Sequence, residues 1–133
     1  MKFIQDDLNI KETYEAFVTH SIESPFLSTH FIESAINVFR IFEIDTVITV
    51  QEDDSFYFNH NGHGMTPINY SEDIIKYEKK KWYKNVTGFQ LREMKSYYKT
   101  YNMLGEKIGH VTLDKKAAFT IEDEFDLKIV NHI

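Results

Sequence analysis

The chain has 133 residues, of which 42% are hydrophobic, and this length and composition favour a single domain with one core. Its formal net charge of −6 argues against a nucleic-acid partner, because neutralising phosphates requires a basic face. The absence of cysteine excludes disulfides and thiolate metal sites. No apolar run approaches the roughly 20 residues that span a bilayer, and no signal peptide is recognisable, so we expect a cytoplasmic protein without a membrane partner.

Two helices are predicted in the first 40 residues. Asn9 and Glu12 have the spacing of a capping box, and an apolar stripe continues from them to Val18. The chain breaks at Pro25, because proline disfavours helix in the residue before it. Beyond the break, apolar residues recur with helical spacing after a cap at Ser28 or Thr29 and predict an amphipathic helix. Its apolar positions are Ile32, Ala35, Ile36 and Phe39.

A hairpin and a third helix are predicted next. Residues 46–51 are rich in β-branched side chains and precede a polar turn at residues 52–54, so we expect residues 56–58 to form the second strand. Residues 71–84 are predicted to be helical, because acidic residues open the segment and lysines close it, as the helix dipole favours.

The rest of the chain is predicted as three strands and a closing helix. Residues 86–93 form the first strand, in which Gly88 marks a bulge, and the alternating side chains of residues 96–104 form the second. Residues 107–113 form the third, and a loop leads to a helix over residues 119–133. In that helix, Thr120 and Asp123 have the spacing of a capping box.

The element order predicts an α+β fold. Strands joined by short turns imply an antiparallel sheet of five to six strands with flanking helices, the N- and C-terminal helices being packed together on one face. We expect one domain over residues 1–133, with a helical lead-in at residues 1–28 and a core at residues 29–133. Because the last helix is apolar up to its final residue, we expect it to connect to a further domain of a longer protein.

Two motifs near the C-terminus resemble those of the GAF domain, a small-molecule sensor module of bacterial signalling proteins. Residues 105–113 match the family's small turn followed by Ile-Gly and apolar residues, and residues 119–125 match its Phe-Thr, acidic and apolar start of the last helix. A weaker likeness covers residues 31–50. The resemblance implies a profilin-like sheet and a non-catalytic regulatory role, with the signal relayed to a cyclase, phosphodiesterase, kinase or transcription factor. The related PAS fold has a similar sheet and role.

Aromatic side chains indicate where a ligand would bind. Eight tyrosines, eleven phenylalanines and one tryptophan exceed what one core of this size requires, and such groups suit a pocket for a flat or apolar ligand. The ligand position in GAF domains implies a site formed by residues 46–51, 60–69, 71–84 and 96–104. The candidate ligand-binding residues are Tyr57, His60, His63, Trp82, Tyr83, Tyr97, Tyr98 and Tyr101. The alternative for the tyrosines is a sheet face packed on helices. No residue set selects one ligand, although the lack of cysteine argues against a covalent bilin.

The histidines and carboxylates do not predict a metal site or a catalytic centre. His60 and His63 flank an Asn-Gly pair, but no third ligand is close in the sequence, so neither a metal nor a haem is expected. Paired carboxylates lie in a turn and at a helix start, where solvation and capping account for them. No catalytic residue is therefore predicted. The alternative is a small α+β enzyme that uses His60 and His63 with a carboxylate.

The closing helix predicts a homodimer. Its apolar residues point to more than one side, and one core cannot easily bury them all. The predicted dimer contact, shared with the first helix, comprises Ile121, Phe125, Leu127, Ile129, Val130 and Ile133. A dimerisation module without any ligand is the second alternative to the sensor.

Overall fold

The computed structural model describes residues 14–69 and 81–133, which belong to two compact units. The sheet unit comprises Met1–Gln51 and Asn85–Ile133, and the hairpin unit is Glu52–Lys84. Among the described residues, none of the helices combines the length and the hydropathy of a membrane span.

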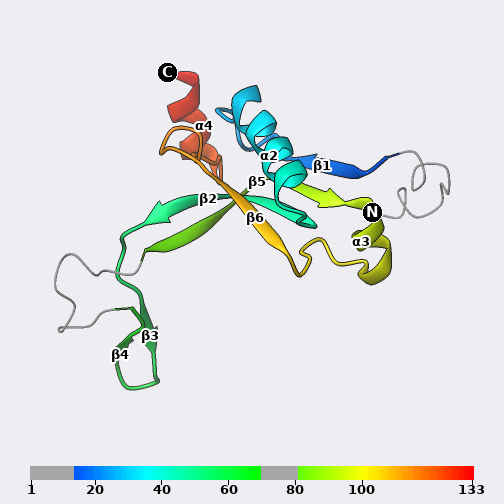
Figure 1. Ribbon diagram of the computed structural model, residues 1–133. Coiled ribbons are helices and arrows are strands. Elements are labelled where there is room, and N and C mark those ends of the chain that lie inside the picture. The colour runs from blue at the N-terminus through cyan, green and yellow to red at the C-terminus, as the bar shows by residue number, and fades with distance from the viewer. Residues whose placement is uncertain (1–13, 70–80) are drawn as a thin grey trace. The chain divides into compact units, whose positions relative to one another are not determined.

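The sheet unit is built on four strands in the order β1-β5-β2-β6 (Figure 1). β1 (Ala16–His20) pairs antiparallel with β5 (Trp82–Glu93). β2 (Thr46–Asp53) pairs parallel with β6 (Ile108–Thr112). The sheet is therefore mixed, and the prediction of an antiparallel sheet of five to six strands is wrong. The parallel pair arises because the chain between β5 and β6 forms a helix instead of the predicted strand.

Helix α2 (Thr29–Ile41) confirms the predicted amphipathic helix. Ala35 and Phe39 lie one turn apart and are its buried residues, and the helix contacts β6. Gly109 in β6 permits this approach, because a Cβ atom there would lie 2.2 Å from Ile44 Cδ1 and 3.0 Å from Val38 Cγ1. The close packing of Ile44, which follows the helix, and of Val38 within it therefore explains this glycine.

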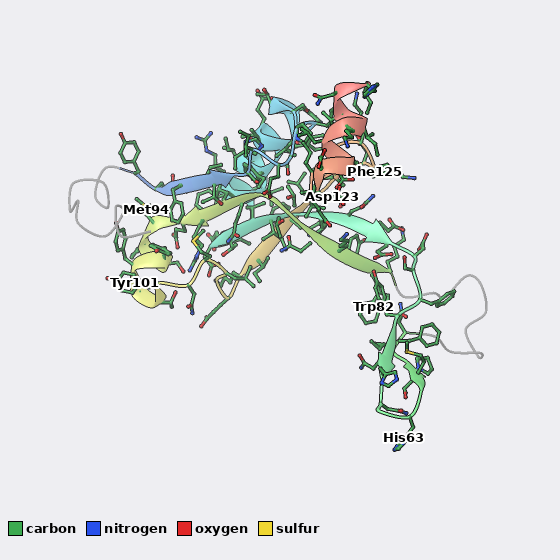
Figure 2. The ribbon with its side chains drawn as sticks, turned by 180° about the vertical axis from the view of Figure 1, so that it is seen from behind. His63, Trp82, Met94, Tyr101, Asp123 and Phe125 are labelled. Atoms are coloured by element: carbon green, nitrogen blue, oxygen red, sulfur yellow. The ribbon has the colours of Figure 1, made fainter. Side chains whose placement is uncertain are left out.

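The core of the sheet unit joins residues of α2 to residues of the sheet and of the segment after β6. Its buried members are Ala35, Phe39, Val47, Val86, Phe89, Leu91, Val111, Leu113 and Ala117. Both views show α2 and α4 over the same face of the sheet (Figures 1 and 2). Gly88 in β5 lies against Ser24, whose Oγ would be 1.9 Å from a Cβ atom at this position. The glycine thus makes room for a buried serine.

The predicted first helix is wrong where the structure describes it. Ala16–His20 form the strand β1, which continues the backbone ladder at the edge of β5. Phe17, Val18 and Thr19 favour a strand, and this pairing outweighs the helical spacing of the apolar residues. Residues 1–13 of the prediction lie outside the described residues. The expected packing of the N-terminal helix on the C-terminal one stays a prediction, and the helices described over one face of the sheet are α2 and α4.

The predicted strand over residues 96–104 is also wrong. Met94–Thr100 form helix α3, which buries Met94 and Tyr97, three residues apart on one helical face. Tyr97 packs edge to face on Phe17 of β1, with ring centroids 5.3 Å apart. The helix places Met94 and Tyr97 on one buried face. In the sequence, the alternation of tyrosines and polar residues over residues 96–104 instead favoured a strand.

The hairpin unit contains a different hairpin from the predicted one. β2 continues to Asp53, and β3 (Phe58–His60) pairs antiparallel with β4 (Met65–Pro67). The turn between them uses the side chain of Asn61, whose Oδ1 accepts hydrogen bonds from the N–H groups of His63 and Gly64, both at 2.9 Å. Most of the predicted helix over residues 71–84 lies outside the described residues, and its end, from Trp82, belongs to β5.

The last helix is shorter than predicted. α4 spans Glu124–Asn131, and the N–H of Ile121 donates to Glu23 O at 2.9 Å, so residues 119–123 run outside the helix. Asp123 is the N-cap, and its Oδ1 accepts from the N–H of Asp126 at 2.9 Å. The cap therefore lies three residues beyond the predicted Thr120.

Replacing this cap should destabilise the sheet unit slightly. We expect Asp123→Ala to lower the free energy of unfolding by about 1 kcal/mol, because the N–H of Asp126 loses its acceptor. Urea denaturation measures the change. Glu122→Ala removes the same charge just outside the helix and is the matched control. Equal stability of the two variants would show that Asp123 does not act as a cap.

Candidate ligand-binding cleft

An open cleft of about 850 Å³ lies in the sheet unit. Its walls come from the end of α2, the connection from α2 to β2, the end of β5, helix α3 and the turn before β6. These segments meet because β2 and β6 are parallel and begin at the same end of the sheet, where the antiparallel β5 ends. The topology thus brings loop residues that are distant in the sequence to one place.

Arg92 forms the floor of the cleft, and its side chain is completely buried. Its Nε donates to Asn102 O at 3.1 Å, and its Nη1 donates to Asp45 O at 2.9 Å. The same Nη1 lies 3.4 Å from Asp45 Oδ1, which makes an ion pair. A buried arginine of this kind requires paired partners, because an isolated buried charge is strongly disfavoured.

The carboxylate of Asp45 holds the turn before β6 in place. Its Oδ1 accepts from Thr46 Oγ1 at 2.7 Å, and its Oδ2 accepts from the N–H groups of Glu106 and Lys107 at 3.1 and 3.2 Å. Burial acts to raise the pKa of Asp45, but these hydrogen bonds and the charge of Arg92 outweigh it, so the pKa lies below the ordinary 3.8. The group is therefore ionised at neutral pH.

Gly105 is required where this turn crosses the ion pair. A Cβ atom at this position would lie 1.9 Å from Asp45 Oδ1 and 2.7 Å from Arg92 Nη1. The N–H of Gly105 donates to Thr46 Oγ1 at 2.9 Å. The backbone of the turn therefore packs directly on the charged pair.

The remaining charges around the cleft are mixed in sign. The acidic side chains that line it, besides Asp45, are Glu15, Glu43, Glu93 and Glu106. The basic ones, besides Arg92, are Arg40, Lys99 and Lys107. A cleft lined by both acidic and basic side chains suits a small hydrophilic molecule better than a flat apolar one.

Sequence analysis did not identify this site. The local sequence gives little signal, because Arg92 stands between Leu91 and Glu93 near the end of a predicted strand and nothing there shows that its side chain is buried. Its partner could not be recognised, because Asp45 is 47 positions away.

The predicted aromatic site residues lie in both units. Tyr57, Trp82 and Tyr83 line a hollow of about 270 Å³ in the hairpin unit, together with Asp53 and Ile68. Three others, Tyr97, Tyr98 and Tyr101, form an edge-to-face cluster at α3 with centroids 5.7 to 6.2 Å apart. None of these six lines the larger cleft. Their role in ligand binding stays a prediction.

The two histidines lie at the β3–β4 turn of the hairpin unit. His63 is at its tip (Figure 2), and His60 accepts at Nδ1 from the N–H of Gly62 at 3.1 Å. Both are exposed. Within residues 14–69 and 81–133, no group of three His, Asp or Glu side chains is placed to hold a metal ion.

A carboxylate in the hairpin unit has a strongly lowered pKa. Tyr57 Oη donates to Asp53, as does the N–H of Ser55 at 2.8 Å, and these bonds lower the pKa of Asp53 to about 2. The same bond from Tyr57 raises the pKa of the phenol above 10.0. Asp53 is therefore ionised and acts as an acceptor within the hollow.

Removing the phenol should shift the titration of Asp53. We expect Tyr57→Phe to raise the pKa of Asp53 from about 2 towards 3.8, because the hydrogen bond that contributes most is lost. Carbon-13 NMR of the carboxyl groups follows this titration. Tyr101→Phe, in the sheet unit, should leave it unchanged. An unaltered pKa in Tyr57→Phe would contradict the assigned donor.

The apolar residues predicted for a dimer contact lie at the surface of the sheet unit. Phe125 is 69% exposed and Leu127 46%, and α4 contains no buried residue. Ile129 and Ile133 are also exposed, whereas Ile121 and Val130 are half-buried. The predicted excess of apolar side chains is thus present, and the homodimer itself stays a prediction.

Comparison with known proteins gives one finding about the fold. No family model matches the chain, and no curated protein matches it. Among solved structures, it is similar to 4-diphosphocytidyl-2C-methyl-D-erythritol synthase from Anaerococcus prevotii, with a TM-score of 0.67 and 16% identity. The likeness covers 98% of this chain and 62% of that one, so the chain spans about three fifths of that enzyme's length. At this identity, the two share a fold.

Proposed function

We propose that the chain forms the acceptor-binding part of a nucleotidyltransferase and that its cleft holds a small hydrophilic molecule. The observation that carries this proposal is the cleft of about 850 Å³, with its polar lining. The likeness to the fold of a synthase that makes a diphosphocytidyl compound supports it. This proposal assigns binding to the chain and no catalytic residue, in keeping with the expectation from the sequence.

In such a reaction, an oxygen atom of the acceptor attacks the α-phosphorus of a nucleoside triphosphate. A new phosphorus–oxygen bond forms, the bond to the β-phosphate breaks, and pyrophosphate leaves. The part assigned to this chain is to hold and orient the acceptor. The cations Arg40, Lys99 and Lys107 would bind its anionic group, and the surrounding glutamates would accept hydrogen bonds from its hydroxyl groups.

Binding of acceptor-like molecules tests the proposal. The purified chain is titrated with erythritol phosphate, ribitol phosphate and a hydroxylated carboxylic acid while amide signals are followed by NMR. We expect saturable shifts at Asp45 and Gly105–Lys107 with at least one compound, and weaker binding by a Lys99→Ala and Lys107→Ala double variant. Glu33→Ala, on an exposed face of α2, is the control. No binding, or shifts confined to the hollow of the hairpin unit, would overturn the proposal.

A regulatory sensor domain is the second candidate function. It is supported by the sequence resemblance to GAF domains and by the exposed apolar residues of α4, and it includes the proposal that the α+β fold is GAF-like. In this role, ligand binding would bias two arrangements of a homodimer and relay the signal to another domain.

Light scattering discriminates the sensor from the acceptor-binding domain. For the sensor we expect a dimer at high micromolar concentration that Phe125→Glu converts to a monomer. Phe125 is 69% exposed in the single chain, and a charge at this position would be buried without a partner in the proposed dimer contact. A wild-type monomer at that concentration would argue against the sensor.

A further inference from the structure

Arg92 has hydrogen-bonding capacity that its own chain leaves unused. The protein satisfies Nε and Nη1 of its guanidinium, whereas Nη2 makes no hydrogen bond within the described part of the chain. Buried polar groups are almost always paired, so an unpaired pair of donors on a cationic side chain calls for a missing acceptor.

The missing acceptor cannot be Asp45 in its present arrangement. Its two carboxylate oxygens already accept from Thr46 and from the N–H groups of Glu106 and Lys107. The ion pair to Arg92 is made through Nη1 alone, at 3.4 Å. Hydrogen-bond donors therefore exceed acceptors at the floor of the cleft, and the unpaired donor, Nη2, belongs to a cationic side chain.

We propose that Arg92 Nη2 is an anion-binding group and that the cleft takes a ligand bearing a carboxylate or a phosphate. An anionic oxygen fits this position better than water, because it forms charge-assisted hydrogen bonds with a guanidinium. Lys99 and Lys107 line the same cleft and would hold further oxygens of the anion. The inference rests on the proposed function in that both place a ligand in the same cleft. It adds which side chain binds the anionic end of that ligand.

The turn from Tyr101 to Lys107 packs against the guanidinium of Arg92. Asn102 O accepts from Arg92 Nε, and Gly105 packs on Nη1, so this turn lies directly against the guanidinium. The side chain exposes no surface in this arrangement. Ligand binding is therefore expected to displace the turn, and the amide signal of Gly105 should report it.

Arginine side-chain NMR tests the inference directly. The sequence contains two arginines, Arg40 and Arg92, and both line the cleft. Their Nε–H signals are assigned with Arg40→Lys and then followed while the wild-type chain is titrated with inorganic phosphate or with acetate. Sodium chloride at the same ionic strength is the control for screening.

We expect the Arg92 signal and the Gly105 amide to shift saturably with phosphate, acetate or both, and not with chloride. A response to phosphate alone assigns a phosphate monoester, and a response to acetate alone assigns a carboxylic acid. An Arg92 signal that neither anion moves up to tens of millimolar overturns the inference.

A conservative variant provides a second measurement. Arg92→Lys keeps the charge but removes Nη2, and we expect it to weaken anion binding roughly tenfold, whereas Glu33→Ala should leave it unchanged. Equal affinity of Arg92→Lys and wild type would overturn the inference. If that variant fails to fold, the arginine signals of the wild type still decide the question.

The outcome separates this inference from the proposed function. Inorganic phosphate and acetate are neither nucleotides nor polyols, so the Arg92 measurement does not depend on acceptor binding. A chain that binds polyol phosphates without a response of Arg92 loses this inference and keeps the proposed function. A chain whose Arg92 binds phosphate but that binds none of the acceptor panel keeps the inference and loses the proposed function.

Discussion

Replacing Asp45 with alanine should lower the free energy of unfolding by about 3–5 kcal/mol, because a buried cation would be left without its counter-charge. Arg92 is fully buried and makes its ion pair with this carboxylate. The N–H groups of Glu106 and Lys107 would lose their acceptor as well. Urea denaturation followed by circular dichroism measures the difference.

The control for this prediction is Glu33→Ala, which also removes one negative charge but from an exposed face of α2. It should change the stability by less than about 0.5 kcal/mol. Similar losses in the two variants would show that net charge, and not the buried pair, accounts for the effect.

Acidification should reduce the difference between wild type and Asp45→Ala. The folded-state pKa of Asp45 lies below 3.8, so its stabilising contribution is complete above this ordinary value. It is lost as the pH falls below 3.8 through the folded-state pKa, when the carboxylate is protonated in the native state as well. Denaturation curves at decreasing pH should therefore converge for the two proteins. A constant difference down to strongly acidic pH would contradict the ion pair.

Gly105→Ala is expected to destabilise the sheet unit by about 1–3 kcal/mol through overpacking. The new Cβ would lie 1.9 Å from Asp45 Oδ1 and 2.7 Å from Arg92 Nη1. Neither side chain can move away without breaking the hydrogen bonds that hold it. The clash must therefore displace the backbone of the turn, and anion binding in the cleft should weaken at the same time.

The matched control for Gly105→Ala is Gly64→Ala. No heavy atom lies within 4 Å of a Cβ at Gly64, and its φ is not in the left-handed region. Alanine there should be neutral or slightly stabilising, because it reduces the entropy of the unfolded chain. If both glycine variants were equally stable, the close packing at Gly105 would be refuted.

The elements that could be predicted are those whose own sequence determines them. α2 shows an amphipathic stripe, and the β-branched residues of β2 favour a strand in any context. β1 and α3 could not be predicted in this way, because the conformation of each depends on contacts with residues far away in the sequence. β1 exists through its ladder with β5, and α3 through the packing of Tyr97 on Phe17.

The cleft could not be predicted for the same reason. Asp45 ends the connection after α2, Arg92 lies near the end of β5, and Gly105 lies in a turn. Each residue has an ordinary local explanation, and only the parallel pairing of β2 with β6 brings them together. The tyrosines, by contrast, were conspicuous in the sequence, but at α3 they contact one another.

The two units differ in how far their contacts reach along the chain. In the floor of the cleft, the bond from Arg92 to Asp45 joins residues 47 apart, and the bond from Lys107 to Asp45 joins residues 62 apart. The contacts that close the β3–β4 hairpin join near neighbours. Each long-range contact requires the closure of a long loop, so the floor costs more chain entropy to assemble than the β3–β4 hairpin. A chain cleaved in the β3–β4 turn can keep this floor intact, whereas one cleaved between α3 and β6 loses it.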